Sequence, residues 1–325
     1  MGQRQEKPPT IIDLARATGL SKSVVSRALN KEPGVSPESR EAVLSAATEM
    51  GYVANAMARR MRSHSVDTVG VLVRDPASVF YGTLLGELQS AASERGVRLV
   101  TMTGSGKPDL EEERVALRSL LALRVDGLLV CSGLLPAGDL YPFAERVPTV
   151  VVGRSEWDSR ISSVCCDDED GARQLVDYVV DAGYTKIIVP VPQGLTAPSL
   201  HIRANLLIAH LRVRGLQPHV IEAEDPEFVL TRVQGANKPG DKVAVMAPND
   251  RWAVALREGL VTTPGVLVTG YDGVGVYTSP LLGLTTFVQP IEEIASNALD
   301  LVVDILTTAR EAEHLALPGS LRIAS

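Results

Sequence analysis

The sequence predicts two parts of different fold class, a short all-α segment at the N-terminus and a long α/β domain made of two doubly wound lobes. Three observations predict this division. Residues 1–52 carry helix caps and helix-type apolar spacing. Residues 64–325 alternate short apolar runs with helical stretches, as repeated strand–helix units do. The charge also changes sign between the two parts.

The bulk composition is that of an ordinary globular protein. A chain of 325 residues, 45% hydrophobic and 22% charged, is long enough for two or three domains and is not disordered as a whole. It contains no run of about twenty apolar residues, and its first ten residues lack the apolar core of a signal peptide. We therefore expect a cytoplasmic protein with no membrane partner.

The net charge of -7 conceals an asymmetry between the two parts. Residues 1–62 contain ten Lys and Arg against six Asp and Glu, whereas the remainder contains 22 against 33. An acidic surface is repelled by phosphate, so the N-terminal segment is the part that would contact any nucleic acid.

Helix signals begin at residue 10. Thr10 and Asp13 have the spacing of a capping box, so a helix should begin there, and Gly19 should end it as a left-handed cap. A second helix is predicted over Lys22–Asn30, with Val25 facing inward and polar side chains facing outward, namely Lys22, Ser23, Ser26 and Arg27.

A third helix should have Ser36 as its cap and Pro37 at its first position, and should end near Gly51. Two short helices separated by a glycine turn, with a third that completes a small core, are typical of a helix-turn-helix unit. The alternative is a helical bundle with no role in DNA binding.

The identity and order of the residues in this segment add a resemblance. The residues concerned are Thr10, Asp13, Leu14, Ala15, Gly19, Ser21, Val25, Ser26, Arg27, Leu29, Asn30, Val35, Ser36, Gly51 and Tyr52. This pattern resembles the DNA-binding headpiece of lactose-repressor-type (LacI/GalR) transcriptional regulators. The resemblance implies a double-stranded operator DNA as partner.

The resemblance also implies which side chains contact the DNA. Lys22, Ser23 and Arg27 would meet base edges in a major groove, where Arg27 can bond guanine O6 and N7 together. A second set would hold phosphates and fix the register: Thr10, Ser21, Ser26, Asn30 and Ser36. Val24 stands where the family often has a hydroxyl residue, so either one phosphate contact is missing or a thymine methyl is read instead.

Residues 53–63 form a short, Ala-rich segment with three arginines. About ten residues are marginal as an isolated helix in water, so this segment needs a partner to become ordered. It resembles the family's hinge helix, which pairs across a dimer and contacts DNA, here through Asn55, Ala58 and Met61. Met61 would be the minor-groove wedge, where leucine is usual, and Ala54 replaces a common proline. The alternative is a plain basic linker.

Beyond residue 63 the pattern changes to buried strands alternating with helices. The apolar runs are Val69–Val73, Leu99–Met102, Gly127–Cys131, Thr149–Gly153, Lys186–Val191, Val243–Ala247 and Val266–Gly270. Such units predict parallel, Rossmann-like sheets. Because there are too many strands for one sheet, we expect two lobes, with a crossing between them at Asp158–Ser163. We expect an N-lobe of about 64–160 and 290–318 and a C-lobe of about 161–289.

Polar residues come directly after several of these strands or after the crossing: Asp75, Asp167, Asp168, Asn249, Asp250 and Asp272. Strand ends of two doubly wound lobes face one crevice, so these side chains should converge there. The lactose-repressor resemblance extends through this domain, at Val125-Asp126-Gly127, Asp167, Arg203, Asn249-Asp250, Gly270-Tyr271-Asp272 and Gln289-Pro290, and covers nearly the whole chain.

The resemblance implies a periplasmic-binding-protein-like domain with an effector cleft. With Asp75, the expected effector-binding residues are Asp167, Arg203, Asn249, Asp272 and Gln289, with Phe80 and Tyr81 at the rim. Carboxylates accept and arginine donates, which suits the paired hydroxyls of a sugar or polyol. The alternatives are that Asp272 caps a helix and that Arg203 forms a salt bridge between lobes.

Two departures from the family pattern concern assembly and cleft shape. The segment from Asn249 to Asp272 is several residues short, and Trp252 within it faces either the ligand or the core, with core burial preferred. The closing LPGSLRIAS has no apolar heptads, so we expect no tetramerising tail. A homodimer is expected because two half-sites double the contacts of one headpiece.

No catalytic constellation is present in the sequence. The five histidines are scattered, there is no phosphate-binding glycine loop, and three cysteines, Cys131, Cys165 and Cys166, have neither metal-site nor disulfide spacing. We interpret these thiols as buried on strands and expect no enzyme, no cofactor and no metal.

The sequence thus predicts a sequence-specific transcription regulator, a repressor that binds a palindromic operator as a homodimer under the control of a sugar-like effector. Activation in place of repression, and an inducer or a corepressor as effector, stay open. The alternative from another class is a solute-binding protein of a transport system, which would share the two-lobed domain but predicts a signal peptide and no headpiece.

Overall fold

The computed structural model describes residues 9–29, 32–52, 68–236, 242–261, 263, 265–308 and 311–324. The chain divides into two compact units, Met1–Ser65 and Val66–Ser325. Each unit has its own buried core, so each is described by itself.

The first unit contains three helices, α1 (Ile11–Thr18), α2 (Lys22–Leu29) and α3 (Pro37–Glu49). Thr10 and Asp13 form the predicted capping box, and Gly19 ends α1 with a left-handed φ of 67°. Ser36 caps α3 by accepting a hydrogen bond from the Ser39 amide at 3.2 Å. The predicted starts and stops of the first and third helices are therefore confirmed.

The core of this unit is small and fully apolar. Leu14 of α1, Val25 and Ala28 of α2, and Val43 of α3 are all completely buried, one or two from each helix. Because each helix contributes only one face to this cluster, the opposite face of α2 is left for other contacts.

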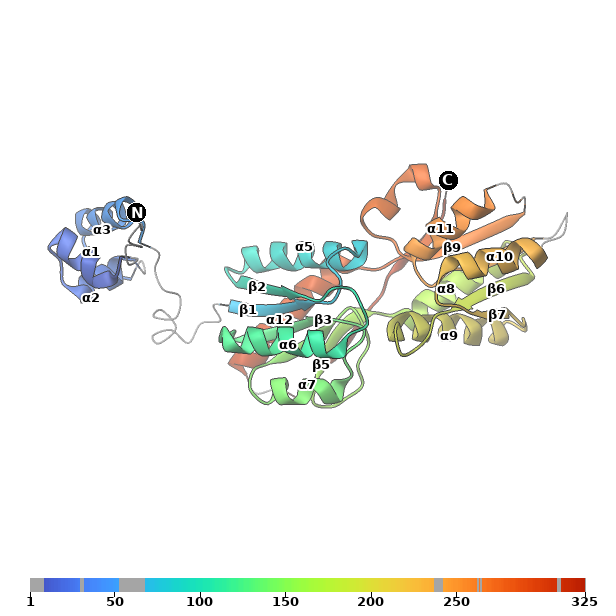
Figure 1. Cartoon of the computed structure of the whole chain (residues 1–325), viewed down its shortest axis with the longest axis horizontal. Coiled ribbons are helices and arrows are strands. Elements are labelled where there is room, and N and C mark those ends of the chain that lie inside the picture. Colours follow the sequence, from blue (N-terminus) through green and yellow to red (C-terminus); the bar gives the residue numbers. More distant parts are fainter. Residues whose placement is uncertain are drawn as a thin grey trace, which may run out of the picture. The chain divides into compact units, whose positions relative to one another are not determined.

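The second unit begins with a six-stranded sheet (Figure 1). Its order is β11-β5-β4-β3-β1-β2, and every pairing is parallel. The strands are β1 (Thr68–Val73), β2 (Arg98–Thr103), β3 (Gly127–Cys131), β4 (Thr149–Val152), β5 (Ser162–Cys166) and β11 (His314–Leu317). The helices are α5 (Val79–Glu94), α6 (Leu110–Ala122), α7 (Ala137–Ala144) and α12 (Ile291–Thr307), with α5 packed beside α12.

A second six-stranded sheet, of order β12-β10-β9-β8-β6-β7, forms the other lobe. It is parallel except for β12, which pairs antiparallel with β10. The strands are β6 (Lys186–Val191), β7 (His219–Glu222), β8 (Val243–Met246), β9 (Val266–Asp272), β10 (Thr285–Val288) and β12 (Ser320–Arg322). The helices are α8 (Asp168–Asp181), α9 (Pro198–Val213), α10 (Pro226–Ala236) and α11 (Asp250–Leu260), and two short 3-10 helices are η1 (Gly275–Thr278) and η2 (Pro280–Leu282).

The chain passes between the two sheets three times. The passages lie at Asp167, between β5 and α8, at Gln289–Pro290, between β10 and α12, and at residues 318–319, between β11 and β12. The predicted crossing at Asp158–Ser163 is wrong, because β5 belongs to the first sheet. The buried residues of β5 are serines, cysteines and one valine, so the sequence SSVCC gives little of the aliphatic signal of a central strand.

The three cysteines lie on strands and are buried and free, as predicted. Burial raises the pKa of the Cys131 thiol to about 12 and that of Cys165 to about 12, so both thiols stay protonated at neutral pH. In the described part of the chain, no helix combines the length and apolarity needed to cross a membrane.

The Thr10 cap gives a test of the first unit. Replacing the cap hydroxyl in Thr10→Ala leaves α1 amides without their acceptor and should cost about 1 kcal/mol. Amide hydrogen exchange of the full chain should show weaker protection across α1 to α3, whose shared core opens as one unit. Thr48→Ala, a hydroxyl removal late in α3, is the matched control, and equal effects of the two changes would contradict the capping account.

Candidate functional site

The outward face of α2 is the candidate DNA-reading surface. Lys22 and Ser23 are exposed, and Arg27 is half-buried. The Arg27 Nε donates to the Ser23 carbonyl at 3.4 Å, which keeps the guanidinium along the helix. Arg40 of α3 fixes the end of this helix by donating to the Ala28 carbonyl at 3.2 Å. The structure thus brings the three predicted base-reading side chains onto one short helix.

The residues predicted to hold phosphates are not all equivalent. Thr10, Ser21 and Ser36 are exposed at helix starts, where their hydroxyls can meet a phosphate. Ser26 was predicted to face outward, but only 9% of it is exposed. It lies one residue after Val25 and three before Leu29, and these spacings place it at the edge of the buried stripe. Asn30, Asn55, Ala58 and Met61 lie outside the described residues.

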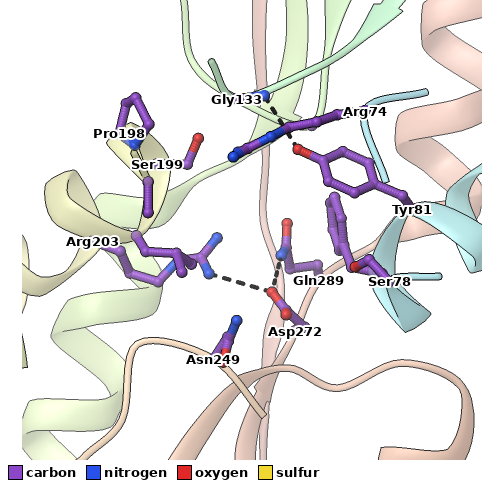
Figure 2. A pocket seen from close by; sticks show the side chains of 14 residues that line it. Arg74, Ser78, Tyr81, Gly133, Pro198, Ser199, Arg203, Asn249, Asp272 and Gln289 are labelled. Atoms are coloured by element: carbon purple, nitrogen blue, oxygen red, sulfur yellow. Dashed lines mark hydrogen bonds and ion pairs between the residues drawn. The ribbon is translucent and has the colours of Figure 1, made fainter. Parts of the chain in front are cut away.

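A pocket with about 580 Å³ of empty space, the open solvent at its mouth included, lies in the second unit, at the ends of strands from both lobes (Figure 2). Side chains and backbone of both lobes line it, in chain order Arg74, Ser78, Phe80, Tyr81, Gly133, Gly153, Ala197, Pro198, Ser199, Leu200, Arg203, Asn249, Asp272 and Gln289. Parallel sheets place the carboxyl ends of their strands at one edge, which explains why residues so far apart in sequence meet here.

Arg203 of α9 is the most strongly held charge in the pocket. Its guanidinium lies 3.3 Å from Asp168 Oδ1 and 3.3 Å from Asp272 Oδ1, and 3.6 Å over the ring of Tyr271. It also donates to the Pro248 carbonyl at 3.2 Å. Burial alone lowers the pKa of Arg203, but the neighbouring Asp168 and Asp272 carboxylates outweigh it and raise the pKa above the usual value. Arg203 therefore forms ion pairs, but its partners and Arg203 itself all belong to the second lobe, so these pairs do not join the two lobes.

Asp272, at the end of β9, is the main acceptor. Its Oδ1 receives hydrogen bonds from Arg203 Nη1 and, at 2.8 Å, from Gln289 Nε2. Burial raises its pKa to about 6, although Arg203 and Gln289 act in the opposite direction. Its φ of 112° is in the region that favours glycine, a strained conformation of the kind found at functional sites.

Two further predicted residues are fixed by local contacts. Asn249 caps α11 through Oδ1, which accepts from the Trp252 amide at 3.0 Å, so its NH₂ group is left for the pocket. The Tyr81 hydroxyl accepts from the Gly133 amide at 3.2 Å, and burial raises the pKa of Tyr81 to about 12. Phe80 packs edge-to-face on Tyr81. The pocket therefore combines an aromatic wall with amide and carboxylate groups.

Asp75 and Asp167 are absent from the residues that line this pocket, so their contact with an effector stays a prediction. The Asp75 carboxylate accepts from the Ala77 amide at 3.0 Å, and the Asp167 carboxylate caps α8 by accepting from the Asp170 amide at 3.0 Å. Both side chains thus hold the backbone immediately after them. Trp252 is 8% exposed and packs in the core of the second lobe, as preferred from the sequence.

Sequence reasoning missed Arg74, Ser78 and Ser199. Arg74 comes directly after β1, so inspecting every residue at a strand end finds it. Ser199 lies at the start of α9, separated from the end of β6 by a loop, and nothing in its surroundings in the sequence marks it.

The buried carboxyl of Asp250 fixes the backbone next to Asp272. Asp250 has no exposed surface, and its two oxygens accept from Thr286 Oγ1 at 2.5 Å and from the Gly273 amide at 2.7 Å. Burial, and then the nearby charge of Asp272, raise its pKa to about 7. A Cβ at Gly270 would lie 2.1 Å from this carboxylate, so the strand must carry glycine there.

A helix-turn-helix unit and a two-lobed domain with a pocket between its lobes, on one chain, define a class of ligand-responsive DNA-binding proteins. Residues 10–55 match the family model of bacterial regulatory proteins of the lacI family. Residues 66–302 match the model of periplasmic binding proteins and the sugar binding domain of the LacI family.

Relatives of established name match over nearly the whole chain. The HTH-type transcriptional regulator GalS of Salmonella typhimurium is 30% identical, with 96% of this chain and 95% of the relative covered. The HTH-type transcriptional repressor PurR of Vibrio parahaemolyticus is 28% identical, with 94% and 93% covered. Catabolite control protein A of Priestia megaterium is 28% identical, with 90% and 91% covered.

Solved structures of the same architecture also match. The lac repressor dimer bound to operator and the anti-inducer ONPF has a TM-score of 0.82 at 23% identity, covering 98% of this chain and 99% of that one. The transcriptional regulator CelR in complex with cellobiose has a TM-score of 0.64 at 25% identity, covering 97% and 98%. The chain belongs to the LacI family and is a DNA-binding transcriptional regulator with an effector-binding domain.

The raised pKa values give a test of the pocket. Asp250 and Asp272 have folded pKa values of about 7 and about 6, above the usual value of 3.8, so their protonated forms favour the folded state. This contribution is complete below the unfolded value and is lost as the pH rises through the folded values. The free energy of unfolding should therefore fall as the pH rises from the ordinary value of 3.8 through the folded values of about 6 and about 7.

Asp250→Asn removes one of the two carboxyl groups with a raised pKa. The free energy of unfolding should then fall less steeply with pH, by at most about 1.4 kcal/mol per pH unit. Denaturant unfolding of the second unit at a series of pH values measures it. Glu258→Gln, an exposed change on the same helix, is the control and should keep the wild-type slope. Equal slopes for Asp250→Asn and wild type would contradict the burial of an ionisable Asp250.

Proposed function

We propose that the chain is a transcriptional repressor that binds a palindromic operator as a homodimer and responds to a small polyhydroxylated effector in the pocket. Residues 1–52 would read DNA, residues 53–63 would link the parts, and residues 64–325 would bind the effector. The observation that carries this function is the pairing, on one chain, of an exposed polar face on α2 with a pocket rich in donors and acceptors.

The face of α2 supports direct base recognition. Helix-turn-helix proteins place their second helix in the major groove, with its N-terminal side chains on base edges. Lys22 and Ser23 are the first residues of α2, and Arg27 lies one turn further along the same helix. Lys and Arg both donate to guanine O6 and N7, and Arg can contact both atoms at once.

A homodimer is supported by the small size of the first unit and by an apolar surface on the second. One unit of three short helices offers few base contacts, and two copies on a palindrome double them. Leu281 and Val276, on η2 and η1, are strongly exposed, and a second copy would cover them. The matching lac repressor structure is a dimer on its operator.

A hydroxylated effector fits the mixed chemistry of the pocket. Each sugar hydroxyl both donates and accepts, and the pocket offers acceptors on Asp272 and Gln289 and donors on Arg203 and Asn249. Phe80 and Tyr81 give an aromatic wall for the apolar face of a ring. The related CelR structure contains cellobiose, a sugar.

The three passages between the lobes suggest how effector binding would change operator binding. Binding between two lobes changes their closure, and hinges at a few residues absorb the change. Gln289 contacts Asp272 in the pocket and lies at the second passage, so effector binding acts directly on a hinge. Coupling between effector and operator of about 1–3 kcal/mol is the usual magnitude for such a switch.

The base-reading role of Arg27 is tested by Arg27→Ala. This change should relax the preference for one base pair in each half-site, at a cost of about 1–3 kcal/mol for the preferred sequence. Fluorescence anisotropy with single-base operator variants measures the change. Arg118→Ala, an exposed arginine of α6 in the other unit, is the control. An unchanged preference among base pairs at every operator position would contradict the base-reading role of Arg27.

The pocket is tested by Asp272→Asn, which keeps the shape of the side chain and removes its charge. Wild-type protein should be stabilised against heat by at least one member of a panel of neutral and acidic sugars, whereas the variant should lose that shift. Operator affinity without sugar should stay within about twofold, because Asp272 belongs to the second unit. Asp177→Asn on α8 is the matched control, and an undiminished thermal shift in Asp272→Asn would contradict the pocket.

A further inference from the structure

A second cation, Arg74, lies in the pocket. Its backbone is fixed after β1, since its amide donates to the Cys131 carbonyl at 3.1 Å and its carbonyl accepts from the Gly106 amide at 3.1 Å. The side chain is 15% exposed and lines the pocket. Figure 2 shows it reaching across the pocket on the side away from Asp272. A guanidinium therefore forms part of the wall that an effector would meet.

The charge of Arg74 is only partly balanced. Among the described carboxylates, Glu113 alone lies within ion-pair distance, with 3.8 Å between Arg74 Nε and Glu113 Oε1. Neither of these two buried atoms has a hydrogen-bond partner, and the other Glu113 oxygen accepts from Ser132 Oγ at 2.6 Å. Burial raises the pKa of Glu113 above its ordinary value. Arg74 thus keeps positive charge available to a ligand.

Arg203 presents the opposite case. Asp168 and Asp272 both lie 3.3 Å from its guanidinium, so that side of the pocket carries no uncompensated cation. Gln289 is 4% exposed, and its Oε1 has no hydrogen-bond partner although its Nε2 is bound to Asp272. In Figure 2 this oxygen points away from Asp272. An unpartnered buried acceptor at the pocket calls for a donor from a ligand.

The start of α9 adds to the positive potential near Arg74. Arg74 Nη2 donates at 3.0 Å to the carbonyl of Thr196, two residues before the helix begins. Ala197 at the N-cap gives no side-chain hydrogen bond, and the pocket is lined by residues 197–200 of this helix start. The first residue of α9, Pro198, has no N–H, so the amides of Ser199 and Leu200 are the donors of the first turn, and such amides favour an anion. The guanidinium and the helix start therefore act on the same part of the pocket.

Building on the function proposed above, we propose that the effector is anionic: a small polyhydroxylated molecule whose carboxylate or phosphate is held by Arg74 at the start of α9. Its hydroxyls would meet the opposite wall, formed by Asp272 and Gln289. The planar guanidinium suits either anion, because it can donate two parallel hydrogen bonds.

The test compares matched neutral and anionic ligands on the full chain. The panel contains D-glucose, D-galactose and D-fructose, each with its sugar acids and its phosphate monoesters. Thermal unfolding finds the members that bind, and isothermal titration gives their Kd values. At least one anionic member should bind about tenfold or more tightly than its neutral parent, the usual advantage of a charged hydrogen bond. Binding by sugar acids assigns the anion as a carboxylate, and binding by phosphate esters assigns it as a phosphate.

Variants of Arg74 trace the preference to this side chain. Arg74→Gln should bring the Kd values of the anionic ligand and its neutral parent to within about twofold, while Arg74→Lys, which keeps the charge, should retain a preference for the anion. Arg173→Gln, an exposed arginine of α8 that lies outside the pocket, is the control and should leave the preference unchanged.

Three results would overturn the inference: a neutral parent that binds as tightly as its anions, a panel in which no anionic member binds, or a preference that persists in Arg74→Gln. The comparison of ligands on wild-type protein is decisive even if a variant folds poorly. Operator binding without any ligand tests the proposed function separately. A chain that prefers its operator but binds neutral sugars best overturns only the anionic effector.

Discussion

The three passages of the chain between the lobes are the constraint on which the rest of the second unit depends. They bring the carboxyl ends of two parallel sheets to one place and leave a pocket there. The Arg203 ion pairs bind this region together, because one guanidinium contacts Asp168 beside the first passage and Asp272 beside the second. Buried ion pairs stabilise little against apolar packing, but removing one partner is costly, so this network fixes geometry.

The electrostatics of the pocket follow from that arrangement. Asp272 is an acceptor held at a raised pKa and in a strained backbone conformation, next to a fully compensated Arg203. Arg74, on the other wall, has one described carboxylate within ion-pair distance, the buried Glu113, 3.8 Å from its Nε. The two walls therefore differ in charge, because the arginine of one is paired with two carboxylates and that of the other with one. Since Gln289 joins the first wall to a passage, a ligand that contacts it can act on the relation between the lobes.

Much of this could be predicted from the sequence, for local reasons. The headpiece helices follow their caps, Thr10, Gly19 and Ser36, because capping depends on residues three or four apart. Most strands follow aliphatic runs, but β5, made of serines, cysteines and one valine, does not, and the first passage was misplaced as a result. Asp75 and Asp167 come just after strands, as expected of site residues. Their carboxylates nevertheless accept hydrogen bonds from backbone amides two or three residues later, because free amides so close in the chain are available as donors. Ser26 shows the same limit, because its burial depends on packing between helices.

Selection of binding sites from random duplex DNA by the purified full chain tests the central claim most directly, because it assumes neither an operator nor an effector. The account predicts enrichment of a palindrome with half-sites spaced by about one helical turn, as expected for two copies that each place α2 in a major groove. Recovery of unrelated sequences at every round, with no motif shared among them, would contradict it.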